Sequence, residues 1–149
     1  MCERQYYANY ITVFSSGGAI VSPNFPQNYP DNMECYWTIT VSSDKTIKFQ
    51  FLGSFGLVEH GCTGFLSNND YVSIKDGSST QSKLLGKFCR GKPVDPVFSS
   101  GPNAVVEFSS DNGGSYKGFY LIFEAVEGNF FFAIYYLFIC SILFCFSMR

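Results

Sequence analysis

Residues Gly18–Pro30 read GAIVSPNFPQNYP, an uncharged segment with three prolines. Proline fixes φ and has no backbone N–H donor, so the part from Val21 to Pro30 is predicted to be extended but outside any sheet ladder. Phe25 and Tyr29 each precede a proline. We expect their rings to plug one end of a β-sandwich.

The chain around this segment is patterned for short β-strands. Ile47, Phe49 and Phe51 alternate with polar residues, the period of two that a half-buried strand requires. Further strands are expected at 36–41, 71–74, 104–108 and 119–123, with turns between them at 15–18, 76–77, 99–103 and 111–114. No charged amphipathic helix pattern occurs before Glu127. The pattern predicts an all-β fold, an antiparallel two-sheet β-sandwich.

The composition limits the possible classes of function. The 149 residues correspond to about one domain, and 46% hydrophobic residues suffice to bury a core. Ten Lys and Arg against twelve Asp and Glu give a net charge of −2, which lacks the basic excess that nucleic-acid binding needs. The chain has a single histidine, His60, and neither a G-x-S-x-G nor an H-E-x-x-H motif. We therefore expect a binding protein and not an enzyme.

The cysteines indicate an oxidising compartment. Four lie in the domain and two in the apolar C-terminal tail: Cys2, Cys35, Cys62 and Cys89, then Cys140 and Cys145. None forms a C-x-x-C pair, which argues against a structural zinc site or a redox pair. Four well-spaced cysteines in a domain of this size are typical of two disulfides. Their spacing leaves all three possible connectivities open.

Several motifs occur together in an order typical of one extracellular family. They are Cys2, Gly18–Pro30, Cys35–Trp37, Glu59–Cys62, Asp70–Gly77, Leu84–Cys89, Phe108–Asp111 and Lys117–Phe119. The chain from Cys2 to Val126 therefore resembles a CUB domain, the β-sandwich module of complement proteases, developmental metalloproteases, endocytic receptors and spermadhesins. The resemblance implies a jelly-roll-like sandwich over residues 1–127. It also implies sequential disulfides, Cys2–Cys35 and Cys62–Cys89.

Three acidic residues far apart in the sequence carry the functional prediction. Many CUB domains bind one calcium ion, and the resemblance assigns its carboxylate ligands to Glu59, Asp70 and Asp111. Because Asp111 starts a glycine-rich turn, we expect a backbone carbonyl of Gly113 or Gly114 to complete the shell. Calcium prefers oxygen ligands, and three neighbouring carboxylates repel one another unless a cation lies between them. The family tyrosine that orients the glutamate corresponds to Tyr29.

The spacing before Asp70 differs from the family pattern. Seven residues separate Cys62 from Asp70, where the family usually has two. The extra residues either bulge outward and leave the carboxylate in place, or they displace it. In the second case, the acidic residues are ordinary solvated loop residues.

The implied function is recognition outside the cell. CUB domains commonly capture a basic side chain of a protein ligand, so we expect calcium-dependent binding of a protein whose exposed Lys or Arg docks on Glu59 and Asp111. Such binding should weaken with salt. Two alternatives remain: a non-catalytic module of a larger extracellular protease or receptor, and a spermadhesin-like carbohydrate binder.

Residues 128–149 form a hydrophobic tail. From Phe130 to Phe146 no residue is charged, a length close to the shortest helix that spans a bilayer, and Arg149 follows. We expect a helical membrane tether with the domain outside the cell. A lipid-anchor attachment signal and a non-native C-terminus are the alternatives. No signal peptide is visible at the start of the chain, so the extracellular prediction, secreted or cell-surface, depends on the disulfides and the resemblance.

Overall fold

A computed structural model describes residues 9–53, 57, 70–89 and 95–128, with side chains from residue 14 onward. Within these ranges, every regular element is a β-strand. The strands are β1 (Asn9–Phe14), β2 (Gly17–Val21), β3 (Glu34–Thr40), β4 (Lys45–Phe51), β5 (Tyr71–Asp76), β6 (Lys83–Phe88), β7 (Val97–Phe98), β8 (Asn103–Ser109) and β9 (Tyr120–Glu127).

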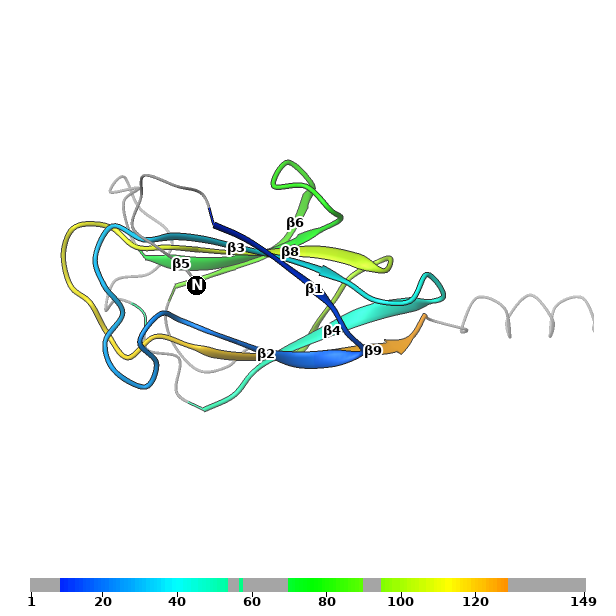
Figure 1. The fold of residues 1–149 in the computed structure, drawn as a ribbon, viewed down its shortest axis with the longest axis horizontal. Coiled ribbons are helices and arrows are strands. Elements are labelled where there is room, and N and C mark those ends of the chain that lie inside the picture. Colours follow the sequence, from blue (N-terminus) through cyan, green and yellow to red (C-terminus); the bar gives the residue numbers. More distant parts are fainter. Residues whose placement is uncertain (1–8, 54–56, 58–69, 90–94, 129–149) are drawn as a thin grey trace, which may run out of the picture.

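The strands form two sheets that face each other (Figure 1). The five-stranded sheet has the order β1-β3-β8-β5-β6, and the four-stranded sheet has the order β2-β9-β4-β7. The predicted all-β sandwich is therefore confirmed. The strands expected from residue patterns correspond to β3, β4, β5, β8 and β9, with shifts of a few residues at their ends.

One pairing departs from the antiparallel prediction. β1 lies parallel to β3, in a register that places Asn9 beside Cys35 and Phe14 beside Thr40. Only Ser15 and Ser16 separate β1 from β2, yet the two strands belong to different sheets. The chain therefore crosses between the layers at this point, which a hairpin would not do. The predicted turn at 15–18 is correspondingly shorter, because β2 already begins at Gly17.

Aromatic rings fill the space between the sheets. Phe119 meets Trp37 of β3 and Phe51 of β4 edge-on, with ring centroids 6.3 and 6.2 Å apart. Phe108 of β8 lies 5.6 Å from Phe119 and 5.2 Å from Tyr29. The Tyr29 side chain is fully buried. The expectation that Tyr29 plugs one end of the sandwich is therefore confirmed.

The same expectation is wrong for Phe25. Its side chain is 37% exposed, and its ring tilts against Tyr120 at 5.8 Å on the outer surface of the four-stranded sheet. The reason is a tight turn in which the Phe25 N–H donates to the Ser22 carbonyl and Asn24 has a φ of 62°. This turn carries the ring out of the core, while Tyr29, four residues later, enters it.

Both domain cysteines in the described ranges, Cys35 and Cys89, are disulfide-bonded and buried. They are not bonded to each other. Cys35 lies in one cross-strand row with Phe88, the residue directly before Cys89, and three strand spacings separate Cys35 from Phe88. That separation is roughly 14 Å, twice the Cα distance that a disulfide allows. Of the three connectivities, the one that contains Cys35–Cys89 is excluded. Cys2 and Cys62 lie outside the described residues, so the sequential pairing stays a prediction.

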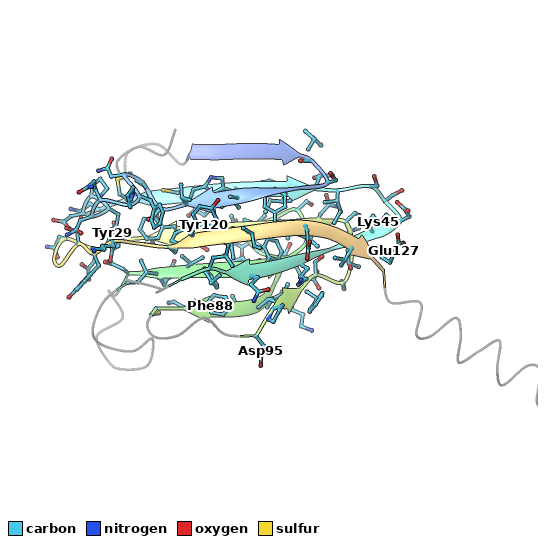
Figure 2. All side chains as sticks on the ribbon, turned by 90° about the horizontal axis from the view of Figure 1, so that it is seen from below. Tyr29, Lys45, Phe88, Asp95, Tyr120 and Glu127 are labelled. Atoms are coloured by element: carbon cyan, nitrogen blue, oxygen red, sulfur yellow. The ribbon has the colours of Figure 1, made fainter. Side chains whose placement is uncertain are left out.

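The two ends of the sandwich differ in their chemistry. Tyr29 lies at one end and the pair Lys45 and Glu127 at the other, as Figure 2 shows.

The predicted tether at 130–146 lies outside the described residues. In the part of the chain that is described, no helix has the length and apolar character needed to cross a membrane.

Gly118 provides a test of the close packing next to Phe119. It has a φ of 80°, and a Cβ added there would lie 1.7 Å from the Ser22 Oγ, which accepts a hydrogen bond from the Phe119 N–H. We expect Gly118→Ala to lower the free energy of unfolding by at least about 2 kcal/mol, because a strained backbone and a steric clash add together. Urea denaturation followed by tryptophan fluorescence measures the change.

Gly101→Ala is the matched control, because its φ is not positive and its added Cβ would meet no atom within 4 Å. This control should be close to neutral. Equal stability of the two variants would contradict the packing described around Phe119.

Candidate metal site

Asp70 lies at the end of the core, directly before β5. Its side chain is 1% exposed. The Tyr29 hydroxyl donates a hydrogen bond of 2.5 Å to one carboxylate oxygen, and the Asp111 backbone N–H donates one of 2.7 Å to the other. The β5–β8 register, which pairs Tyr71 with Ser109, places Asp70 within one position of Asp111 along the two strands. The extra residues before Asp70 are therefore compatible with a buried, ordered carboxylate.

The electrostatic environment of Asp70 disfavours its charge. Burial raises the pKa of the carboxyl. The bonds from Tyr29 and the Asp111 N–H act in the opposite direction, and the charges of Asp111 and Asp31 raise the pKa further, so that the net shift is upward. Within the described ranges, no Lys or Arg forms an ion pair with Asp70. A buried carboxylate among other acids is an environment that a bound cation would stabilise.

The loop after β8 presents Asp111 next to Asp70. The Asp111 carboxylate accepts a 2.9 Å hydrogen bond from the Gly113 N–H, and its carbonyl accepts one of 2.7 Å from the Asn32 N–H. These bonds hold the loop against the residues that follow Pro30. Asp31 and Asp111 retain solvent exposure, unlike Asp70. The site thus combines one buried carboxylate with two that solvent can reach.

The structure brings together part of the predicted ligand set. Asp70, Asp111 and Tyr29 meet as described, and Gly113 is bonded to Asp111. Glu59 lies outside the described residues, as does any bond to it from Tyr29. Within the described ranges, no group of three or more His, Cys, Asp or Glu side chains is close enough to hold a metal ion.

Sequence reasoning missed Asp31. Its charge acts on Asp70 although 39 positions separate the two residues in the sequence. The available signal was its position two residues after Tyr29, which packs against Asp70. An acid next to a residue that orients a ligand is a candidate for the same site.

A buried ion network joins the two strands that lead to Asp70 and Asp111. Glu107 of β8 is 8% exposed, although it lies on the outer surface of its sheet. Its carboxylate accepts hydrogen bonds from the Tyr71 hydroxyl at 2.8 Å, the Ser73 hydroxyl at 3.1 Å and the Lys75 ammonium at 2.7 Å. The Lys87 ammonium lies 3.9 Å from the centre of the Tyr71 ring. Three donors from β5 therefore fix that strand against β8.

The network shifts the ionisation of its members. Burial raises the pKa of Tyr71, and the bond to the Glu107 carboxylate raises it further, because a charged acceptor holds the phenolic proton. Burial also acts to raise the pKa of Glu107, but the bonds from Lys75, Tyr71 and Ser73 outweigh burial and hold that pKa below its ordinary value. Glu107 is therefore ionised and satisfied at neutral pH.

Comparison with known proteins identifies relatives across most of the domain. The family profile of the CUB domain matches residues 8–123. Rat (Rattus norvegicus) cubilin is 37% identical over 113 residues, which is 75% of this chain and 3% of cubilin. Human (Homo sapiens) tolloid-like protein 1 is 34% identical over 107 residues, which is 72% of this chain and 10% of that protein. The chain thus spans a small part of the length of these relatives.

Solved structures agree with these sequence relatives. The MASP-1 CUB2 domain bound to Ca²⁺ has a TM-score of 0.67 and 30% identity, and the match covers 77% of this chain and 97% of that one. The CUB1-EGF-CUB2 domain of human MASP-1/3 has a TM-score of 0.66 and 32% identity, covering 79% of this chain and 41% of that one.

The Glu107 network predicts a dependence of stability on pH. Because the folded-state pKa of Glu107 lies below its unfolded value of about 4.5, its bonds contribute stability above that pH, and the contribution is lost as the pH falls through the folded pKa. Glu107→Gln should therefore lower the free energy of unfolding at pH 7 and flatten its decline below pH 5. Urea denaturation between pH 3 and pH 7 measures both effects.

Glu124→Gln serves as the comparison, since Glu124 pairs with Lys48 at 2.6 Å on a half-exposed surface. Exposed pairs contribute little, so this variant should follow the wild-type pH profile. If the two variants had the same profile, Glu107 would not be a buried, paired carboxylate.

Proposed function

The chain belongs to the CUB domain family, and on this basis we propose that it is a non-catalytic extracellular recognition module whose ligand site is organised by one calcium ion. The observation that carries the proposal is the buried Asp70 carboxylate. Two donors hold it, neighbouring acids oppose its charge, and no cation of the described residues neutralises it. A divalent cation would remove this electrostatic cost.

The donor set fits calcium better than a transition metal. The candidate ligands are the carboxylates of Glu59, Asp70 and Asp111 with a carbonyl of Gly113, and Asp31 adds negative charge nearby. Oxygen-only sets select calcium or magnesium, whereas zinc and copper prefer nitrogen and sulfur. Tyr29 would hold Asp70 in position by donating its hydroxyl proton. The calcium in the MASP-1 CUB2 structure supports this assignment by analogy.

The partner is a protein that presents a lysine or arginine side chain. Asp111 and Asp31 remain accessible to solvent beside the buried Asp70. Their carboxylates can therefore accept hydrogen bonds from an incoming ammonium or guanidinium group while the cation keeps the loops in place. Attraction between exposed charges also makes such binding sensitive to ionic strength.

The module is proposed to act within a larger extracellular protein. This chain covers 3% of cubilin and 10% of tolloid-like protein 1, so in these relatives the matched region is one part of a much longer polypeptide. The absence of a nucleophile–base motif in the sequence supports a role in binding, with any catalysis carried out elsewhere.

Calcium should stabilise the domain. Mass action raises the melting temperature of a protein that binds an ion only when folded, so the melting temperature should rise with added CaCl₂ and return with EDTA. Asp70→Asn should abolish the rise, because the amide keeps the shape of the side chain but removes its charge and one of its two acceptor oxygens. Differential scanning fluorimetry across a calcium titration measures both.

Asp44→Asn is the control, since Asp44 lies on the opposite side of the sandwich beside Lys45. It should respond to calcium like the wild type. A melting temperature that calcium leaves unchanged in the wild-type protein would refute the calcium site. A rise retained by Asp70→Asn would place the ion elsewhere.

Ligand recognition can be tested with synthetic peptides. Peptides that contain one lysine should bind more tightly than the same peptides with norleucine in its place when calcium is present. In EDTA the two kinds of peptide should bind equally. Asp111→Ala should abolish the preference for lysine, because the variant lacks one of the two solvent-accessible carboxylates and a proposed ligand of the calcium ion. Surface plasmon resonance in 50 mM and 300 mM NaCl measures the preference and its weakening by salt.

A glycan array probed with the same protein separates the two kinds of ligand. Calcium-dependent retention on glycans, without discrimination between the lysine and norleucine peptides, would replace the protein-ligand proposal with carbohydrate binding.

A further inference from the structure

The outer surfaces of the two sheets differ next to the metal site. On the outer surface of the five-stranded sheet, the Glu107 carboxylate accepts hydrogen bonds from three side chains of β5. On the four-stranded sheet, by contrast, apolar side chains reach solvent at the end that contains the metal site. Val21 is 38% exposed, Phe25 37% and Leu52 46%. All three adjoin Tyr120: Val21 is its partner across the β2–β9 pair, the Phe25 ring contacts its ring, and the Leu52 N–H donates to its carbonyl. A cluster of exposed apolar side chains is a candidate interface.

The edge of this sheet is also unpaired. β2 pairs with β9 on one side, and no other described strand lies beside it. On either side of β2, the Ser22 N–H donates to the Phe119 carbonyl and the Ser16 carbonyl accepts from the Ala125 N–H. In this register the backbone N–H and C=O groups of the even-numbered residues point toward β9. Gly17, Ala19 and Val21 therefore direct their N–H and C=O groups toward the free edge, since these directions alternate along a strand.

The donors and acceptors at this edge match a second copy of the same strand. In an antiparallel pairing of two β2 strands, Ala19 can exchange both backbone bonds with Val21 of the second copy, and Val21 with Ala19. Gly17 would then face Pro23, which has no N–H, but both backbone groups of Gly17 already bond to the Ser15 hydroxyl. The register thus uses the open groups of Ala19 and Val21 and requires none from Gly17 or Pro23.

Charge favours the same occupant. Residues 5–30 contain no charged side chain, so a second β2 strand meets no like charge at this edge. One edge of the other sheet shows the protection that β2 lacks: edge strand β6 carries Lys83 and Lys87, and its pairing with β5 has a register shift at Ile74/Lys75. The opposite edge strand, β1, is uncharged like β2. Lysines and bulges at an edge prevent such pairing.

We propose that the chain forms a two-fold dimer through antiparallel pairing of β2 with β2 of a second copy. The four-stranded sheets of the two copies become one continuous sheet. Ala19 and Val21 of each copy pack against each other on its outer surface, and the apolar surface around Phe25 and Tyr120 extends across the junction. The calcium proposal is not needed for this dimer.

The test is sedimentation velocity of the full chain in a neutral detergent over a concentration series. The wild-type chain should form dimers as concentration rises. Ala19→Lys and Val21→Lys should each weaken dimerisation at least about tenfold, because they place ammonium groups on both sides of one short ladder. Leu84→Lys is the matched control: Leu84 is 52% exposed on the β6 edge, and its replacement should leave dimerisation unchanged.

Hydrogen exchange separates edge pairing from association through another surface. The amides of Ala19 and Val21 should exchange more slowly as the wild-type concentration rises, and this effect should be absent in Ala19→Lys. Melting temperatures of the variants should match the wild type, because both side chains lie on an exposed surface. A chain that stays monomeric, or a dimer that survives both lysine variants, would overturn the proposal.

Discussion

A carboxylate that is removed from water must gain compensating interactions, and this requirement governs one end of the sandwich. Asp70 lies at the end of an aromatic core and depends on the Tyr29 hydroxyl and the Asp111 N–H for its hydrogen bonds. Both donors belong to other parts of the chain. Tyr29 ends the proline-rich segment, and Asp111 follows β8. One buried group thus fixes the start of β5, the proline-rich segment and the loop after β8 relative to one another, and the candidate ligand site lies where they meet.

The core and the site are mechanically connected. Tyr29 packs edge-on against Phe108, and Phe108 packs against Phe119, which also contacts rings from both sheets. On the outer surface, Glu107 fixes β5 to β8 through three donors from β5. The strands that end next to Asp70 and Asp111 are therefore restrained on both surfaces. Asp70 and Asp111 are thus held in place without any bound ion, which would lower the ordering entropy that opposes the proposed binding.

The two outer surfaces divide the remaining roles. On the five-stranded sheet the Glu107 carboxylate is bonded to donors of β5, whereas the four-stranded sheet leaves apolar side chains and the backbone groups of Ala19 and Val21 open at its β2 edge. The proposed ligand recognition by solvent-accessible acids and the proposed self-association through β2 would therefore use different parts of the molecule. The relatives present this module within much longer proteins, where separate contact surfaces on one domain are compatible with simultaneous binding.

Residue patterns alone predicted the all-β class, most of the strands and the burial of Tyr29, because period-two alternation and aromatic residues that precede prolines are local features of the chain. The sequence also placed Asp70 and Asp111 in one candidate site through the family resemblance. It could not locate Phe25, which one tight turn directs outward, or reveal Asp31 and Glu107, whose surroundings come from distant strands. Only the tertiary structure decided that β1 lies parallel to β3 and that Cys35 and Cys89 are too far apart to bond. Pairing partners and distances between them depend on how whole strands are ordered in a sheet, and no short stretch of sequence records that order.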